Sequence, residues 1–332
     1  MLLEILPLNT KVHSDLSSFL TLSLSNPYAP YGVSQDLFVN CVISEISDTV
    51  SKGGFVLVAR EGGKIVGLVS LNRSDWDSKH FAFDMSKIDQ LLAVGNYLDS
   101  TFIKQRLVSN LIARCSKELL LHVSARVNKE DLSSIHALER KYFRLMDILV
   151  TYSIDLRKHI PIQTENPYHI RKFRPDEVSK LEQIALECFR DRALSTDRFH
   201  ADPTFPRAKS SELYAKWLVN SCNDPANEVL VAEIDGKPVG FNVCAFNPSL
   251  TALTGIRIGT MTLTAVDSLA RNKLVATSLL SASLSWFADK VDVIETGGQV
   301  SNIAIQRAWN SVGLRITRSQ CTFHWSVLTE SL

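Results

Sequence analysis

Two segments of the chain share one pattern of apolar and turn-forming residues. Residues 55–67 read FVLVAREGGKIVG, and residues 229–240 read VLVAEIDGKPVG. In each segment an apolar run is followed by a short turn with Gly and Lys and then by a second run, which predicts a β-hairpin. Val58 and Val231 open the shared VA pair and lie 173 positions apart, which indicates an internal duplication.

The pattern that closes each half repeats as well. Residues 119–127 (LLLHVSARV) predict a buried strand, followed by a helical pattern at 131–142 and a strand near 148–154. The same order recurs between residues 291 and 325. Each half therefore predicts strand, helices, hairpin, strand, helix, strand, helix and strand. This alternation favours a layered α/β fold.

The polar segment 157–166 contains Pro161 and is the expected linker between domains at residues 1–157 and 167–332. A length of 332 residues suits two domains, and 45% hydrophobic and 21% charged residues suit folded cores. The net charge is +1 and the basic residues are scattered. We therefore expect neither a nucleic-acid partner nor a membrane partner.

The cysteines and the N-terminus indicate the compartment. The six cysteines contain no CxxC pair, which fits reduced, mostly buried thiols and neither a disulfide framework nor a zinc site. The first residues lack the basic start and continuous apolar stretch of a secretory signal, and no run of about 18 apolar residues occurs. We expect a cytoplasmic protein, and the sequence leaves both a monomer and a homodimer open.

A strand, a polar turn and a helix are predicted in succession in the second half. Residues 261–266 (MTLTAV) are strand-like, residues 267–273 (DSLARNK) are polar, and apolar residues then recur at helical spacing to Phe287. The first N–H groups of a helix lack partners, so such a turn can hold a pyrophosphate, with Arg271 or Lys273 adding charge. Taken alone, the pattern also fits an ordinary connection with a solvated basic loop.

A second segment, which begins at Asn302, shows a resemblance to a known family. Asn302 follows the last core strand, with Trp309 seven positions on and Gly313 and Leu314 eleven and twelve positions on. Together with residues 266–280, this spacing resembles motifs A and B of the GNAT superfamily of N-acetyltransferases. Motif A is a strand, an Arg/Gln-x-x-Gly-x-Gly/Ala loop that holds the pyrophosphate of coenzyme A, and a helix. Motif B runs from an Asn to a Tyr seven residues on and then to a Gly-Phe pair.

The resemblance implies tandem GNAT-like domains, each with a mixed, mostly antiparallel central sheet flanked by helices. It also implies acetyl-CoA as the acyl donor and direct transfer to a primary amine without a metal. Arg271 matches the first position of the loop and Ala276 the last. The residues that the resemblance assigns to acetyl-CoA are Leu263, Thr264, Ala265, Val266, Arg271, Asn272, Lys273, Leu274, Val275, Ala276, Thr277 and Asn302.

Two residues depart from the family pattern. Leu274 stands at the middle glycine of the loop, where its N–H can still reach a phosphate if its φ is negative. Trp309 stands where many members carry a Tyr that protonates the leaving thiolate. An indole donates an N–H but does not titrate. We therefore expect Trp309 beside the sulfur, with water or another group supplying the proton.

Residues 192–217, which contain LSTDRFHADPTF and then SSELYAKW, carry a narrower resemblance. They are similar to dTDP-fucosamine acetyltransferase-like sugar-nucleotide N-acetyltransferases, which implies an amino sugar on a nucleotide carrier as the acceptor. Arg198 is expected to pair with a phosphate of that carrier, and His200 and Asp202 complete the expected substrate site. His200 also has a pKa suited to a general base. In the alternative interpretation, His200 and Asp202 cap or brace the loop and take no part in the reaction.

The predicted catalytic residues are Trp309, with His200 or Glu295 as the base, and Glu233 is a further carboxylate near the end of a core strand. The first half lacks the loop pattern in residues 92–110, so we expect it to pack against the second half or to shape the acceptor site. Two alternatives remain open. One is acetylation of a protein or small-amine acceptor, and the other is an acyl-CoA-binding scaffold without catalysis.

Overall fold

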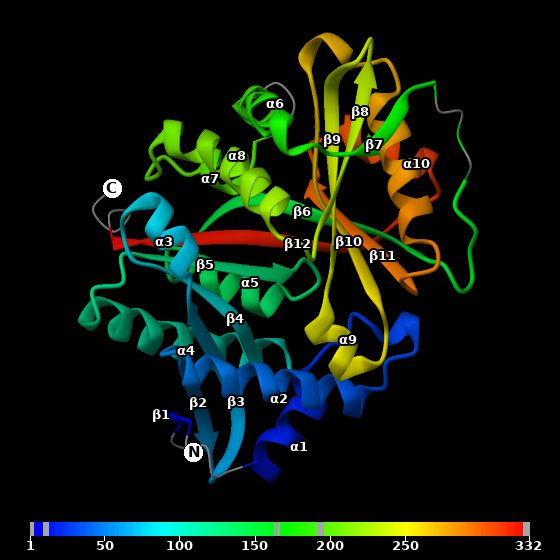
Figure 1. Cartoon of the computed structure of the whole chain (residues 1–332). Coiled ribbons are helices and arrows are strands. Elements are labelled where there is room, and N and C mark those ends of the chain that lie inside the picture. Colours follow the sequence, from blue (N-terminus) through cyan, green and yellow to red (C-terminus); the bar gives the residue numbers. More distant parts are fainter. Residues whose placement is uncertain (1–2, 9–12, 163, 165–166, 191–195, 328–332) are drawn as a thin grey trace. The chain divides into compact units, whose positions relative to one another are not determined.

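The computed structural model describes residues 3–8, 13–162, 164, 167–190 and 196–327. The chain divides into two compact units (Figure 1). Unit 1 comprises Met1–Asp147, Asp202–Thr204 and Gln320–Leu332, and unit 2 comprises Ile148–Ala201 and Phe205–Ser319. Within the described ranges, no helix is long and apolar enough to cross a membrane.

Unit 1 contains a mixed sheet flanked by helices. Its strands follow the order β1-β2-β3-β4-β5-β12, and among the described strand pairs β4 and β5 are parallel while the others are antiparallel. The strands are β1 (Glu4–Pro7), β2 (Phe55–Glu61), β3 (Lys64–Arg73), β4 (Met85–Ala93), β5 (His122–Asn128) and β12 (Arg315–Ser326). The helices are α1 (His13–Ser23), η1 (Ala29–Tyr31), α2 (Gln35–Ser51), α3 (Asp75–Phe81), α4 (Tyr97–Lys117) and α5 (Leu132–Glu139).

Unit 2 repeats this architecture. The order β6-β11-β10-β9-β8-β7 is again mostly antiparallel, with β10 and β11 as the parallel pair. The strands are β6 (Arg144–Asp155), β7 (His169–Lys172), β8 (Glu228–Ile234), β9 (Lys237–Phe246), β10 (Ile258–Val266) and β11 (Val293–Gln299). The helices are η2 (Pro175–Glu177), α6 (Val178–Arg190), α7 (Arg198–Ala201), α8 (Arg207–Asn223), α9 (Pro248–Thr254), η3 (Ser268–Ala270), α10 (Val275–Phe287) and α11 (Ile303–Ser311).

The expected α/β fold and both hairpins are confirmed. The closing strand of each unit, however, comes from the other half of the sequence. In unit 2, Leu149–Asp155 of β6 pairs with β11, and in unit 1, Gln320–Ser326 of β12 pairs with β5. The compact units are therefore not continuous stretches of chain. The sequence-based boundaries, 1–157 and 167–332, stay a prediction about where each duplicated segment begins and ends.

The sheet of unit 2 separates two cores. Along β8, Val231 packs into the core of α6 and α8, and its neighbour Leu230 packs into the core of α10 and α11, as strand alternation requires. On β10 the alternation breaks, because Met261 belongs to the α10 core and Leu263 to the α6 core. The pairing with β9 shifts between these two residues. A bulge at Thr262 thus turns the rest of β10 over.

The duplication is visible in the packing of one glycine in each unit. A Cβ on Gly67 would lie 2.4 Å from Ile103 Cγ2 on α4, and a Cβ on Gly240 would lie 3.3 Å from Val275 Cγ1 on α10. The glycines are 173 positions apart and their helical neighbours 172. Both helices therefore cross the second hairpin strand at the same place, and the absence of a side chain there allows the close approach.

Burial of the cysteines agrees with the expectation of reduced thiols. All six are free, and Cys41, Cys115, Cys244 and Cys321 are buried. Burial raises the pKa of Cys115 and of Cys244 to about 12. These two thiols are therefore unreactive at neutral pH.

Substituting Gly67→Ala tests the helix–strand contact. The new methyl group meets Ile103 in a buried site, so we expect a loss of about 1–3 kcal/mol in the free energy of unfolding, measured by urea denaturation. Gly297→Ala is the matched control, because its Cβ would find neighbours no closer than 3.5 Å. Equal stabilities of the two variants would contradict the contact.

Candidate functional site

The candidate site begins where two parallel strands separate. β10 and β11 pair only over Ile258–Met261 and Val293–Thr296. Beyond the bulge, β10 continues to Val266 with β9 as its partner, and β11 continues to Gln299 with β6 as its partner (Figure 1). From Leu263 onward the backbone groups on the β11 side of β10 are therefore not used in a ladder between these two strands.

β10 leads directly to the N-terminus of α10. Asp267 accepts a hydrogen bond from the Leu269 N–H at 3.0 Å and starts the short turn η3. Leu274 is the N-cap residue of α10, and no side chain in the described part of the chain caps the helix there. The first N–H groups of α10 thus keep their capacity to bind an anion.

The backbone of this turn has the conformation of a glycine loop. Asn272 has φ of +61° and Leu274 has φ of +63°. Leu274 therefore does not meet the condition of a negative φ under which its N–H was expected to reach a phosphate, and the turn keeps the shape that glycine would give it. The left-handed region costs a leucine about 1–2 kcal/mol. Leu274 is 63% exposed, so burial of its side chain contributes little free energy to offset this strain. Strain held at an anion-binding turn favours a functional reason for the conformation.

Unit 1 has the same separation of strands. β4 and β5 pair in parallel over Met85–Ile88 and His122–Ala125, after which β4 follows β3 and β5 follows β12. The helix that comes next is closed, however. Asn96 caps α4 by accepting hydrogen bonds from the N–H groups of Leu98 at 2.9 Å and Asp99 at 3.1 Å. The Asp99 carboxylate lies in the first turn of α4, where it would repel a phosphate.

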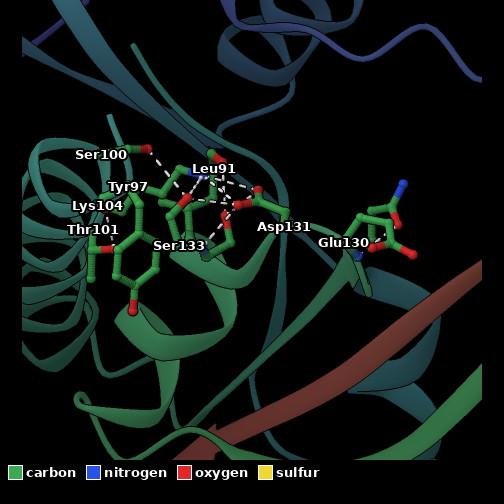
Figure 2. A network of polar contacts seen from close by, with 10 residues as sticks. Leu91, Tyr97, Ser100, Thr101, Lys104, Glu130, Asp131 and Ser133 are labelled. Atoms are coloured by element: carbon green, nitrogen blue, oxygen red, sulfur yellow. Dashed lines mark hydrogen bonds and ion pairs between the residues drawn. The ribbon is translucent and has the colours of Figure 1, made fainter. Parts of the chain in front are cut away.

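In unit 1 a buried polar network joins α4 to the N-terminus of α5, the helices that follow β4 and β5 (Figure 2). Lys104 lies 172 positions before Ala276, and its Nζ is 2.9 Å from both carboxylate oxygens of Asp131 and 2.8 Å from Ser133 Oγ. Ser134 Oγ donates to the Leu91 carbonyl of β4 at 3.3 Å. The Leu91 carbonyl lies beyond the part of β4 that pairs with β5. The equivalent part of β10 in unit 2 does not pair with β11. In unit 1 the side chains of the chain itself therefore occupy the space between the separated strands.

Burial and charge both act on this network. Burial lowers the pKa of Lys104, and the Asp131 carboxylate opposes that effect. Burial would raise the pKa of Asp131, but Lys104 and the two serine hydroxyls outweigh it and lower the pKa. The Asp131 carboxylate is therefore ionised at neutral pH, and both of its oxygens face the Lys104 Nζ. Unit 1 keeps the strand geometry of unit 2 but fills it with an ion pair.

Trp309, the expected thiolate partner, is buried on α11. Its ring centroid is 5.1 Å from that of Tyr152, and its exposed fraction is 2%. The indole Nε1 is buried without a hydrogen-bond partner among the described residues. A Cβ on Gly298 of β11 would lie 2.9 Å from Trp309 Cη2. The indole therefore lies against the part of β11 that has left β10, with a donor to spare.

Glu295 is the best-placed carboxylate. It lies on β11 opposite Thr260, one position before the parallel ladder ends. Its neighbour Ile294 packs into the α10 core, so Glu295 points to the opposite face, which carries α6 and α8. Glu295 Oε2 is 3.4 Å from Arg318. Glu295 Oε1 is buried and has no hydrogen-bond partner in the described part of the chain.

The alternative base Glu233 is engaged elsewhere. Its Oε2 accepts a hydrogen bond from Arg171 Nε at 2.5 Å, and Arg171 also binds Glu177 at 2.8 Å. The Arg171 guanidinium holds the pKa of Glu233 below its usual value. Glu233 thus belongs to an ion-pair cluster between β7 and β8.

The expected substrate residues have well-defined contacts. His200 is buried, with Nδ1 2.6 Å from Asp197 Oδ2 and Nε2 3.2 Å from Ser211 Oγ. The Arg198 guanidinium stacks on Phe199 at 4.3 Å. Asp202 is buried in unit 1, 2.8 Å from His324 Nδ1. The role of these residues in acceptor binding stays a prediction. The bonds at both ring nitrogens favour a bracing role for His200 over a base.

Two residues of the site have no counterpart in the sequence patterns. The Tyr152 hydroxyl donates to Gln306 Oε1 at 3.3 Å beside Trp309. Thr262 forms the bulge, and its Oγ1 is buried without a partner among the described residues. Tyr152 belongs by sequence to the first half and reaches unit 2 through the exchanged strand β6. A search within the second half alone could not find it.

Comparison with known proteins agrees with this geometry. Residues 180–313 match the model of the acetyltransferase (GNAT) family. A tandem GNAT protein of the clavulanic acid biosynthesis pathway has a similar structure, with a TM-score of 0.56 and 14% identity over 98% of each chain. A GCN5-related N-acetyltransferase from Sphaerobacter thermophilus also has a similar structure. Its TM-score is 0.62 with 12% identity, over 98% of this chain and 95% of that chain.

A third similar structure is a glucosamine N-acetyltransferase region of a fungal multi-domain β-N-acetylglucosaminidase. Its TM-score is 0.59 with 14% identity, over 98% of this chain and 38% of that one. No curated protein matches the chain in sequence. The family match supports acyl transfer by the part of the chain at residues 180–313, and the similar structures show that the chain shares the fold of a tandem GNAT protein.

Proposed function

We propose that unit 2 transfers an acetyl group from acetyl-CoA to a primary amine, with an amino sugar on a nucleotide carrier as the acceptor. One observation carries the proposal. In unit 2 the strands β10 and β11 separate beside an uncapped helix N-terminus, and in unit 1 the equivalent helix is capped and a buried ion pair bridges the neighbouring elements. We therefore assign one acetyl-CoA site to each chain.

The donor would lie along β10. The pyrophosphate fits the first N–H groups of α10, where the dipole is positive, with Arg271 and Lys273 beside it. The thioester carbonyl would accept hydrogen bonds from backbone N–H groups between Leu263 and Val266, which stabilise the developing oxyanion. The sulfur would then face Trp309, whose buried Nε1 can donate to it.

The acceptor would approach from the α6 and α8 face. There Glu295 Oε1 takes a proton from the ammonium of the acceptor. The neutral nitrogen attacks the carbonyl carbon, a C–N bond forms, the nitrogen releases its extra proton to water, and the C–S bond breaks to release the thiolate. The thiolate is protonated by water or by the Tyr152 hydroxyl, whose ring lies beside that of Trp309. Holding the amine and thioester together supplies much of the rate.

The choice of acceptor rests on the resemblance of residues 192–217, of which 192–195 lie outside the described residues, to sugar-nucleotide N-acetyltransferases. It gains support from the shared fold with a glucosamine N-acetyltransferase region. Assays of acetyl transfer to dTDP-amino sugars, glucosamine, polyamines and peptides test it directly. Turnover only with peptides or polyamines would refute the sugar acceptor. Acetyl-CoA binding without turnover on any amine would favour a scaffold.

Reversing the charge at position 271 tests the placement of the pyrophosphate. Arg271→Glu should weaken acetyl-CoA binding by roughly 10-fold or more, because it sets a carboxylate against the phosphates. Calorimetric titration should give one site per chain for the wild type. The exposed Arg207 on α8 provides the control Arg207→Glu, which should bind normally. Unchanged affinity of Arg271→Glu would remove the turn from the site.

Leu274→Gly tests whether the strained turn is poised for the phosphate. Glycine adopts a positive φ without strain, so the variant should keep or gain stability, by up to about 1 kcal/mol. Its acetyl-CoA affinity should be equal or higher. The control Leu269→Gly removes another exposed leucine from the same turn and should lower stability slightly. A clear loss of stability only in Leu274→Gly would show that the side chain, not the backbone, matters.

Glu295→Gln tests the base. The amide keeps an acceptor for Arg318 but cannot take a proton, so kcat should fall by about 10²-fold with little change in KM. The difference in kcat between Glu295→Gln and the wild type should become smaller as the pH approaches the pKa of the acceptor amine, because an amine that is already neutral needs no base. Glu233→Gln should retain kcat. If Glu233→Gln loses activity and Glu295→Gln does not, the base is assigned to the wrong carboxylate.

A further inference from the structure

Three polar side chains from distant parts of the sequence meet inside unit 1. His122 opens β5 and lies opposite Ser326, and His324 lies on β12 opposite Ser124. The two histidines therefore share one face of the strand pair, and their rings are 4.5 Å apart. Asp202 joins them from the three-residue segment Asp202–Thr204. The exposed fractions of His122, Asp202 and His324 are 1%, 3% and 2%.

The carboxylate of Asp202 is oriented from two sides. Its Oδ1 accepts hydrogen bonds from the Thr204 N–H at 2.9 Å and the Thr204 hydroxyl at 2.7 Å. Its Oδ2 faces both imidazoles, 2.8 Å from His324 Nδ1 and 3.6 Å from His122 Nε2. A carboxylate held by one oxygen and presenting the other is the usual arrangement of a metal-binding Asp.

The spacing of the three atoms suits a small cation. One ligand atom from each residue can be chosen so that all lie within 4.8 Å of one another. Zinc bonds of about 2.0–2.1 Å in tetrahedral geometry place ligand atoms about 3.3 Å apart. The distances of 2.8 and 3.6 Å from Oδ2 to the two rings fall on either side of that value. Two imidazoles and a carboxylate are a ligand set that zinc commonly takes.

The buried carboxylate also needs a positive charge beside it, which either a proton on a histidine or a cation supplies. A carboxylate as buried as Asp202 requires a compensating positive charge. A proton on His324 Nδ1 would form a hydrogen bond to Asp202 Oδ2 at 2.8 Å. His122 Nε2 is 3.6 Å from the same oxygen, which is longer than a hydrogen bond. A cation between the three atoms would serve both rings at once.

We propose that His122, Asp202 and His324 bind a divalent transition-metal ion, with Zn²⁺ preferred by the ligand set. The ion would fasten Asp202–Thr204 to β5 and to the C-terminal part of β12 within unit 1. Its role is structural, because the site is buried and neither histidine belongs to the acetyl-transfer site proposed for unit 2. A structural ion at this place would contradict the sequence-based expectation of a protein without a metal.

Metal analysis of the full-length chain tests this site. Protein purified without chelator should carry about one zinc per chain, and chelator should remove it. Adding Zn²⁺ to the stripped protein at 100-fold above its Kd should raise Tm by about 5 °C. Co²⁺ should give visible absorption bands of a site with nitrogen and oxygen ligands.

His324→Asn separates a metal site from a hydrogen-bonded cluster. The Asn amide can still donate to Asp202, so this variant should fold, but it should lose both the cobalt bands and the response of Tm to zinc. His169→Ala, which removes an exposed histidine, should behave as the wild type. The proposal is overturned if wild-type protein holds no zinc and its Tm ignores zinc and chelator. It is also overturned if His324→Asn keeps the cobalt bands.

Discussion

β10 changes one of its two neighbours along its length. Over its first four residues it has β9 on one side and β11 on the other, and after the bulge at Thr262 only β9 remains. The bulge turns the side chains over, so that Met261 and Leu263 enter different cores. The two cores hold the strand in this register, because a shift of one residue would move each set of side chains to the wrong face of the sheet. The free backbone edge, the approach to α10 and the position of Glu295 all follow from this register.

The two units show that strand geometry alone does not make a site. β4 and β5 separate as β10 and β11 do, yet the helix after β4 begins at Tyr97 with a side-chain cap, and Lys104 pairs with Asp131. At the matching place unit 2 has the small Ala276 and a longer turn without a cap. The difference lies in a few side chains at one helix N-terminus. Duplicated backbones can therefore serve different purposes at small cost to the fold.

Exchange of the closing strands gives each unit residues from the other half of the sequence. β6 brings Tyr152 to Trp309 in unit 2, and β12 brings His324 to His122 in unit 1. Both pairs are buried, so each contributes to its core as well as to a candidate site. The strands meet these partners because an edge strand must find a neighbour for its backbone groups, and either closing strand offers the same ladder.

The sequence by itself determined the α/β fold, the two hairpins, the duplication and the strand–turn–helix at Met261–Leu280, because these depend on local periodicity, turn residues and spacing. It also supplied Glu295 and Trp309 as candidates. Only the tertiary structure decided that Leu274 adopts a glycine conformation, that His200 is bonded at both nitrogens and that Asp202 lies with two histidines. Asp202 meets its two histidines from distant parts of the sequence, the bonds of His200 depend on how α7 lies against α8, and the φ of Leu274 is a property of the folded turn. No pattern within one stretch of sequence records any of these.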